Sequence, residues 1–277
     1  MLFFGDAKRN TSAFRRTTAI HQYGTGSRLW IAFHGFAREG RSFASFAHFL
    51  PENTCLIALD LPWHGGTEWR EPSFTVADIV QAIEQCLRLK QQTHYTALGF
   101  SFGARLCLAL ASIEAQRWER LILLAPDGLP RGGWYQFVER APLVFKKQVV
   151  KLFAHAQILL RLARTLYNWK LLDGLSYRFL RLHLQSESSC KRLAGIWTSA
   201  AAFPPLRKSC QQIAEKLHLP VQLVTGNEDS VIPQTAFAHL AQHIPQLEWT
   251  KLAHADHDLL SAAVLPQWGH IIRLVVS

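Results

Sequence analysis

The fold of this chain is decided by the stretch Tyr95-Thr96-Ala97-Leu98-Gly99-Phe100-Ser101-Phe102-Gly103-Ala104. An apolar run typical of a buried strand ends at Gly99, and a segment with helical periodicity begins after Gly103. Between them lies Ser101, in the pattern G-x-S-x-G. A strand that turns this sharply into a helix leaves little room for side chains two residues either side of the turn, which explains both glycines. The sequence therefore predicts a strand, a strained turn and a helix, with the Ser101 hydroxyl exposed beside the positive helix end.

The rest of the chain alternates between short apolar runs and helical patterns. An edge strand is expected at 17–23, and buried strands at 29–33, 55–60, 120–126, 219–226 and 247–252. Helical periodicity covers 74–89 and 234–242, and a last amphipathic helix is expected over 258–264, with more helix toward the C-terminus. Nearly continuous apolar strands alternating with helices predict an α/β fold whose mostly parallel sheet is flanked by helices.

The alternation stops near Gly128, and charge marks the same boundary. Residues 131–208 are helix-like and hold 14 Lys and Arg against three acids, a net +11. The rest of the chain holds 16 basic and 17 acidic residues, a net −1. The sequence thus predicts a core formed by 1–130 and 209–277, interrupted by an inserted helical domain at 131–208.

Several explanations suit the basic insertion. It is a solvated polar helix face, a basic amphipathic surface that contacts an anionic membrane, or a patch that steers an anionic substrate such as an acyl thioester or a phospholipid. Nucleic acid is not expected as a partner, because no binding motif accompanies the charge. Oligomeric state cannot be predicted from the sequence.

Composition indicates an ordinary globular protein, with 49% hydrophobic and 18% charged residues. The five cysteines are scattered without C-x-x-C spacing, which is typical of reduced thiols in a reducing compartment. The first apolar run is too short for a signal peptide, and no run approaches the ~18 residues of a membrane span. A cytoplasmic protein is expected, with peripheral contact to the inner face of a membrane as the alternative.

Serine alone is a poor nucleophile and needs a base that is itself oriented by a third group. Asp229 follows the predicted strand at 219–226, and His257 follows the strand at 247–252, so both lie where the carboxyl ends of parallel strands meet. Asp127, after the strand at 120–126, is an alternative acid, and His254 is an alternative base. His254 is less suitable, because the strand is not expected to have ended there.

Five motifs in this order resemble those of the α/β-hydrolase fold family. They are His34-Gly35-Phe36, Asp60-Leu61-Pro62-Trp63-His64-Gly65, Gly99-Phe100-Ser101-Phe102-Gly103, Gly226-Asn227-Glu228-Asp229 and Asp256-His257. The resemblance runs from residue 29 to 257 and does not cover the insertion, which in such proteins is a variable cap. Arg105 departs from the pattern, because small residues are usual just inside this helix.

The resemblance implies a serine hydrolase that works through a covalent acyl-enzyme. Ser101 would attack an acyl carbonyl, His257 would carry the proton, and Asp229 would hold the imidazole. The backbone N–H groups of Phe36 and Phe102 would bind the oxyanion.

His34, Gly35 and Phe100 are expected at the substrate pocket, with His34 also holding the oxyanion loop in shape. The aromatic rings of Phe36, Phe100 and Phe102 favour a small or medium hydrophobic carboxylic ester.

The same triad also serves thioester hydrolysis, C–C bond hydrolysis and acyl transfer, and the fold does not separate them. A non-catalytic, membrane-associated protein that kept the fold is the alternative from another class. No cofactor and no metal are expected, since His254-Ala255-Asp256-His257 has no partner His-x-His motif elsewhere.

Overall fold

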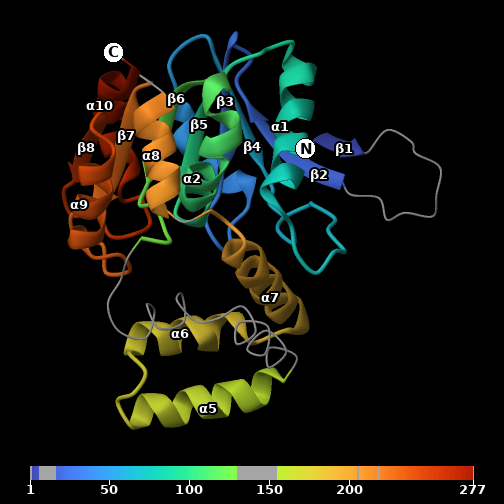
Figure 1. Cartoon of the computed structure of the whole chain (residues 1–277), viewed down its shortest axis with the longest axis vertical. Helices are drawn as coiled ribbons and strands as arrows, with labels where there is room; N and C mark the ends of the chain where they lie inside the picture. Colours follow the sequence, from blue (N-terminus) through green and yellow to red (C-terminus); the bar gives the residue numbers. More distant parts are fainter. Residues whose placement is uncertain (1, 6–16, 130–154, 205, 217–218, 277) are drawn as a thin grey trace. The chain divides into compact units, whose positions relative to one another are not determined.

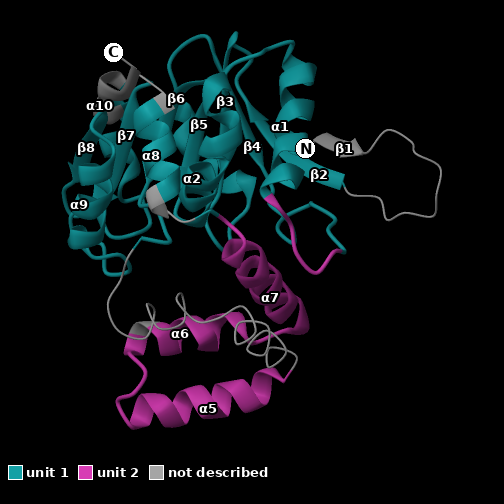
Figure 2. Ribbon diagram, viewed as in Figure 1, with its two compact units in different colours: residues 1–70, 76–129, 204–277 teal, residues 71–75, 130–203 magenta. Residues whose placement is uncertain are grey.

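The computed structural model describes residues 2–5, 17–129, 155–204, 206–216 and 219–276 (Figure 1). The chain divides into two compact units (Figure 2). Unit 1 comprises residues 1–70, 76–129 and 204–277, and unit 2 comprises residues 71–75 and 130–203. Residues 131–154 of the predicted insertion lie outside the described residues.

Unit 1 is built on one mostly parallel sheet, as predicted. The strands are β1 (Leu2–Gly5), β2 (Thr17–Tyr23), β3 (Arg28–Phe33), β4 (Thr54–Leu59), β5 (Tyr95–Phe100), β6 (Trp118–Leu124), β7 (Val221–Gly226) and β8 (Leu247–Leu252). Among the described residues their order is β1-β2-β4-β3-β5-β6-β7-β8. Among these eight strands, β2 pairs antiparallel with β1 and β4, and the other pairings are parallel. Every residue of β4, β5 and β7 is buried, and their polar members Thr54, Thr96, Gln222 and Thr225 are few, so the strands stand out in the sequence as mainly apolar runs.

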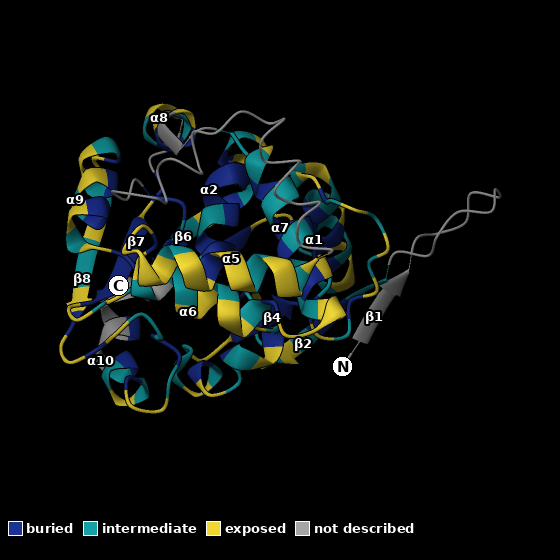
Figure 3. Ribbon diagram, turned by 90° about the horizontal axis from the view of Figure 1, so that it is seen from below, coloured by how far each residue is buried: buried dark blue, intermediate teal, exposed yellow. Residues whose placement is uncertain are grey.

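Helices flank this sheet on both faces. They are α1 (Val76–Lys90), α2 (Phe102–Glu114), α8 (Leu206–Lys216), α9 (Gln234–His243) and α10 (Leu265–Val276), with 3-10 turns η1 (Gly40–Phe43), η2 (Phe46–Phe49) and η3 (Ala115–Arg117). Helices α1, α2 and α8 lie on one face and α10 on the other (Figure 3). Buried Trp268 of α10 meets Phe46 of η2 edge-to-face, with ring centroids 4.9 Å apart.

In unit 2, the described residues 155–203 are mostly helical, as the periodicity predicted, whereas 71–75 form no helix or strand. Unit 2 contains α5 (Ala156–Asn168), α6 (Gly174–His183) and α7 (Glu187–Ala201). Asp173 caps α6 by accepting from the Ser176 N–H, and Ser186 caps α7 in the same way. None of the helices in the described ranges combines the length and hydropathy that crossing a bilayer requires.

The chain after β8 differs from its prediction. Residues 258–264 form turns, and the last helix begins only at Leu265. Pro266 explains the difference. A helix running from 258 through Pro266 would lose one backbone hydrogen bond and bring the ring against the preceding turn, whereas Pro is well suited to a first turn. Strand β1 was also missed, and it adds to the sheet by pairing with β2.

The strand order places the site. The chain leaves β3 for β4 on one side, and then returns to β5 on the other side of β3. At such a switch point the loops at the carboxyl ends of the two strands diverge and leave a crevice. The loops that follow β3 and β5 carry the His34-Gly35-Phe36 motif and Ser101.

Arg105, which departs from the family pattern, lies over a glycine. Gly128 follows β6 with a φ of +78°, and a Cβ atom there would come within 2.6 Å of the Arg105 Cδ atom. The absence of a side chain at Gly128 therefore makes room for the aliphatic part of Arg105.

All five cysteines are free and buried. Burial raises the pKa of the Cys86 and Cys210 thiols to about 12. These thiols are protonated at neutral pH and therefore poor nucleophiles.

Candidate active site

Ser101 is held in a strained turn between β5 and α2. Its backbone has φ of 51° and ψ of −112°, outside the regions that side chains normally favour. Backbone hydrogen bonds hold this conformation, because the Ser101 N–H donates to the Leu124 carbonyl at 2.8 Å and the Ser101 carbonyl accepts from the Asp127 N–H at 3.1 Å. A Cβ atom on Gly103 would lie 1.9 Å from the Phe33 carbonyl oxygen, and one on Gly99 would lie 2.5 Å from the Ala104 Cα. Both glycines of the motif are thus required by close backbone approach.

Asp229 lies in the loop after β7, with both carboxylate oxygens engaged. Its Oδ1 accepts from the backbone N–H groups of Val231 and Ile232, each at 2.8 Å. Its Oδ2 lies 2.9 Å from His257 Nδ1, and the side chain is fully buried. The two backbone donors fix the carboxylate plane, so that one oxygen is turned toward the imidazole.

His257 connects Asp229 to Ser101. Its Nε2 lies 2.9 Å from Ser101 Oγ, while Nδ1 faces Asp229. A carboxylate only accepts, so Nδ1 carries the proton and Nε2 can accept from the serine hydroxyl. The Phe100 ring lies against the imidazole, with centroids 5.7 Å apart. Three predicted residues from distant parts of the chain therefore form one hydrogen-bonded series.

The alternative acid and base lie elsewhere in the same region. His254 is in the turn just beyond β8, almost fully exposed, with Nδ1 3.2 Å from Glu228. β8 ends at Leu252, as the predicted range 247–252 has it, so the expectation that the strand continues to His254 is wrong. Asp127 donates its backbone N–H to the Ser101 carbonyl at 3.1 Å, which places it close to the turn that holds Ser101. Within the described residues no group of three or more His, Cys, Asp or Glu side chains is arranged to hold a metal ion.

The loop after β3 passes directly beside Ser101. A Cβ atom on Gly35 would lie 3.3 Å from the Ser101 Cβ and 3.0 Å from the Phe100 ring. Phe36, the next residue, is part-exposed, whereas Phe102 is the first residue of α2 and is buried. Backbone N–H groups in the first turn of a helix have no intrahelical acceptor, so that of Phe102 is suited to binding an anion.

Two histidines hold this loop to the loop that follows β4. His34 donates from Nδ1 to the Gly35 carbonyl at 2.8 Å and accepts at Nε2 from the Leu61 N–H at 3.0 Å. His64 donates from Nδ1 to the Pro62 carbonyl at 2.8 Å and accepts at Nε2 from the Ala37 N–H at 3.2 Å.

The two imidazoles are buried and pack edge-to-face with centroids 4.9 Å apart. Each ring both donates and accepts, so each is in the neutral Nδ1–H tautomer. His34 is fully buried, so it positions the loop from the interior of the protein.

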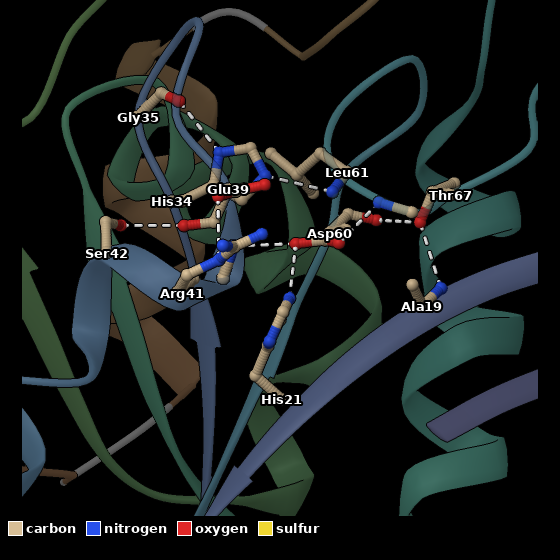
Figure 4. Close-up of polar contacts among 12 residues, drawn as sticks. Ala19, His21, His34, Gly35, Glu39, Arg41, Ser42, Asp60, Leu61 and Thr67 are labelled. Carbon is tan, nitrogen blue, oxygen red and sulfur yellow. Dashed lines mark hydrogen bonds and ion pairs between the residues drawn. The ribbon is translucent and has the colours of Figure 1, made fainter. Parts of the chain in front are cut away.

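The buried carboxylate of Asp60 forms hydrogen bonds that hold the loops after β3 and β4 (Figure 4). Asp60 accepts from the Gly40 N–H at 2.7 Å and from the Gly66 N–H at 2.8 Å, and its Oδ1 lies 3.1 Å from His21 Nε2. A Cβ atom on Gly65 would lie 2.1 Å from Asp60 Oδ2, so glycine is needed there. Asp60 thus fixes η1 and the loop after β4 together.

Replacing Asp60 with alanine is expected to destabilise the protein. Two backbone N–H groups would lose a charged acceptor, and hydrogen bonds of this kind are worth ~1.5–3 kcal/mol each. We expect the free energy of unfolding to fall by about 3 kcal/mol or more, measured by urea denaturation. Exposed Glu52→Ala is the control and should change stability by less than about 0.5 kcal/mol. Equal stability of the two variants would contradict this role for Asp60.

Polar residues beside the predicted triad brace its loops and were not predicted. Ser230 donates its N–H and hydroxyl to Asp256 Oδ1 at 2.8 and 3.0 Å, which joins the acid loop to the base loop. Arg38, two residues after Phe36, forms an ion pair with Asp258 at 2.5 Å.

Burial alone would raise the pKa of the Asp256 carboxyl. Hydrogen bonds from Ser230 and from the backbone of His257 outweigh burial and hold this pKa below its usual value. These bracing residues lie within two positions of Asp229, His257 or Phe36 in the sequence, and this closeness is the signal that could have identified them.

The three phenylalanine rings that were expected to favour a hydrophobic ester differ in exposure. Phe100 and Phe102 are each at most 3% exposed, so their rings belong to the interior. Phe100 supports the His257 ring from within. Of the three phenylalanines, only Phe36 is part-exposed.

A mostly parallel sheet, a strained serine at a strand–helix turn, and a serine, histidine and aspartate in series are together typical of the α/β-hydrolase fold. The sequence model of the alpha/beta hydrolase fold matches residues 31–261, so the chain belongs to this family. The resemblance inferred from the motifs is confirmed.

Characterised relatives are distant. The chain is 23% identical over 253 residues to human monoacylglycerol lipase ABHD6, covering 83% of this chain and 70% of that protein. It is 24% identical over 258 residues to the pimeloyl-[acyl-carrier protein] methyl ester esterase of Nitrosomonas europaea, covering 86% and 91% of the two chains. A thermophilic esterase from Thermogutta terrifontis superposes with a TM-score of 0.66 at 17% identity, covering 100% of this chain and 96% of that one. The chain is therefore related to esterases and lipases.

Proposed function

We propose that the protein is a serine hydrolase that cleaves small or medium hydrophobic carboxylic esters through an acyl-enzyme. One observation carries the proposal: His257 lies within 2.9 Å of both Ser101 Oγ and Asp229 Oδ2. A serine next to a base that is oriented by a buried carboxylate is the arrangement that nucleophilic catalysis requires.

In the first half-reaction, Ser101 Oγ attacks the ester carbonyl carbon while its proton passes to His257 Nε2. The backbone N–H groups of Phe36 and Phe102 receive the negative charge that develops on the carbonyl oxygen. Asp229 stabilises the imidazolium that forms without itself taking the proton. The tetrahedral intermediate then collapses, the alcohol takes the proton from Nε2, and the acyl group stays on Ser101.

In the second half-reaction, water replaces the alcohol. His257 Nε2 accepts a proton from the water as its oxygen attacks the acyl carbon. The bond to Ser101 Oγ then breaks, the serine recovers its proton, and the carboxylic acid leaves. His257 Nε2 faces Ser101 Oγ in both halves, so the same imidazole position serves for both proton transfers.

The substrate class is supported by the site and by the relatives. Phe36 offers a part-exposed apolar ring in the loop that passes beside the nucleophile, which suits an acyl chain. The related monoacylglycerol lipase and methyl ester esterase are both named for ester cleavage. No step of the proposed reaction requires a cofactor. The role of the insertion as a substrate-selecting cap remains a prediction, and the buried free thiols support a reducing compartment such as the cytoplasm.

The test is labelling with a fluorophosphonate, together with p-nitrophenyl esters of increasing chain length and a matched thioester series. We expect one label per chain, on Ser101 by peptide mass spectrometry, and kcat/KM that rises from the acetyl to medium-chain esters. A higher kcat/KM for the thioesters than for the matched esters would identify a thioesterase instead. Neither label nor turnover would contradict a serine hydrolase.

A further inference from the structure

Large hydrophobic side chains are exposed on one short part of unit 2. Of the nine exposed large hydrophobic residues in the described chain, seven lie between residues 158 and 182: Ile158, Leu162, Tyr167, Trp169, Leu171, Phe179 and Leu182. Trp169 is 69% exposed, and Leu171 and Leu182 are each 62% exposed. Single exposed apolar residues are ordinary, but such a concentration is typical of an interaction surface.

Helix α5 is apolar along two separate stripes. Its inner stripe includes Ala163, which is 3% exposed, and the helix packs against α6, where Tyr167 and Tyr177 stack with ring centroids 4.8 Å apart. Its outer stripe consists of Ile158, Leu162 and the adjoining Trp169, which are spaced by four and seven residues and so share one side of the helix. Exposed residues run along α5 and α6 in Figure 3. The outer stripe is therefore additional to the one that α5 needs to pack within unit 2.

Positive charge accompanies the outer stripe. Five basic residues lie on α5, α6 and the turn between them, all exposed: Arg161, Arg164, Lys170, Arg178 and Arg181. Within the described residues none of them forms an ion pair. The single acid between residues 156 and 183 is Asp173, whose carboxylate is occupied in capping α6. The surface is thus apolar and cationic at once.

We infer that the α5–α6 surface docks on an anionic lipid bilayer. Leucine, isoleucine and tryptophan side chains enter the boundary between headgroups and acyl chains, while arginine and lysine heads reach the lipid phosphates. A second copy of this chain fits less well, because a symmetric contact would bring the same five cations against one another. An acidic protein would satisfy the charges without requiring so many exposed aliphatic side chains.

Docking goes beyond the proposed hydrolysis and does not depend on it. If the proposed function also holds, the substrate is an ester carried at a lipid surface, and docking brings the enzyme to it.

The experiment uses the full chain carrying Ser101→Ala, so that binding is measured without turnover. Flotation is compared on vesicles of phosphatidylcholine alone and of equal parts phosphatidylcholine and phosphatidylglycerol, at low and high salt. We expect binding to the anionic vesicles at low salt, weakened by about 30-fold in Arg161→Gln/Arg164→Gln, since each basic residue near the surface contributes about 1 kcal/mol. Ile158→Ser/Leu162→Ser/Trp169→Ser should lower binding by more than about tenfold.

The matched control is Leu89→Ser/Ile113→Ser, which removes the two exposed large hydrophobic residues of unit 1. This variant should float like its parent, and circular dichroism checks that every variant is folded. Absence of flotation at low salt, or equal loss in the control, would overturn the inference. The inference would also be overturned if the triple variant floated like its parent and differed from it only by changing from dimer to monomer in gel filtration.

With an active chain, the triple variant should lose turnover of a vesicle-borne ester and keep turnover of a soluble one. If the triple variant kept turnover of both esters, docking would not be what brings the enzyme to its substrate. If the wild type hydrolyses no ester at all, the proposed function fails while the flotation result still decides docking.

Discussion

Ser101→Ala is expected to lower kcat for activated esters by about 10⁶-fold, equivalent to about 8 kcal/mol of activation free energy. Without the hydroxyl no acyl-enzyme forms, and only the oxyanion donors and substrate binding remain to act on direct attack by water. The measurement is steady-state kinetics with the best ester of the chain-length series, together with fluorophosphonate labelling, which should disappear.

Folding is not expected to account for this loss. Alanine at a φ of 51° is strained much as serine is, and the Ser101 N–H bond to Leu124 is a backbone contact that the substitution keeps. Ser45→Ala is the control, because this serine is exposed and far along the chain from the triad. Ester hydrolysis by Ser101→Ala within tenfold of wild type would show that another residue is the nucleophile.

Much of the fold was predictable because its strands are buried on both faces. β4 and β5 each hold a single polar residue, and such runs stand out without any knowledge of their partners. The sharp turn at Ser101 was predictable for a different reason. Close approach of Gly99 and Gly103 to other backbone atoms forces glycine, which leaves a local pattern in the sequence.

Contacts between distant polar residues were not predictable in the same way. Arg38 and Asp258 are 220 positions apart, and neither residue type in isolation indicates a partner. The buried Asp60 was recognised as part of a motif, yet its role as acceptor for η1 and for the following loop depends on the folded backbone. The last helix was misplaced because periodicity extends to residues that Pro266 excludes from the helix.

Asp229→Asn is expected to lower kcat by about 10⁴-fold with the fold intact. The asparagine carbonyl oxygen should occupy the place of Oδ1, because the N–H groups of Val231 and Ile232 both require an acceptor there. The amide N–H₂ must then face His257 Nδ1, which can accept from it only when the imidazole proton lies on Nε2. In that tautomer Nε2 cannot accept the Ser101 proton, so the base is lost although every residue keeps its position.

Asp127→Asn separates this assignment from its alternative and is expected to cause a far smaller loss. The Asp127 N–H donates to the Ser101 carbonyl, and the substitution keeps this backbone hydrogen bond. Both variants are compared by kcat for one ester, with thermal unfolding as the check on folding. If Asp127→Asn is the more damaging, the acid of the triad is Asp127. A large loss for Asp229→Asn that Asp229→Ala partly relieves would identify the tautomer as the cause, because water in the vacated space can accept from Nδ1–H.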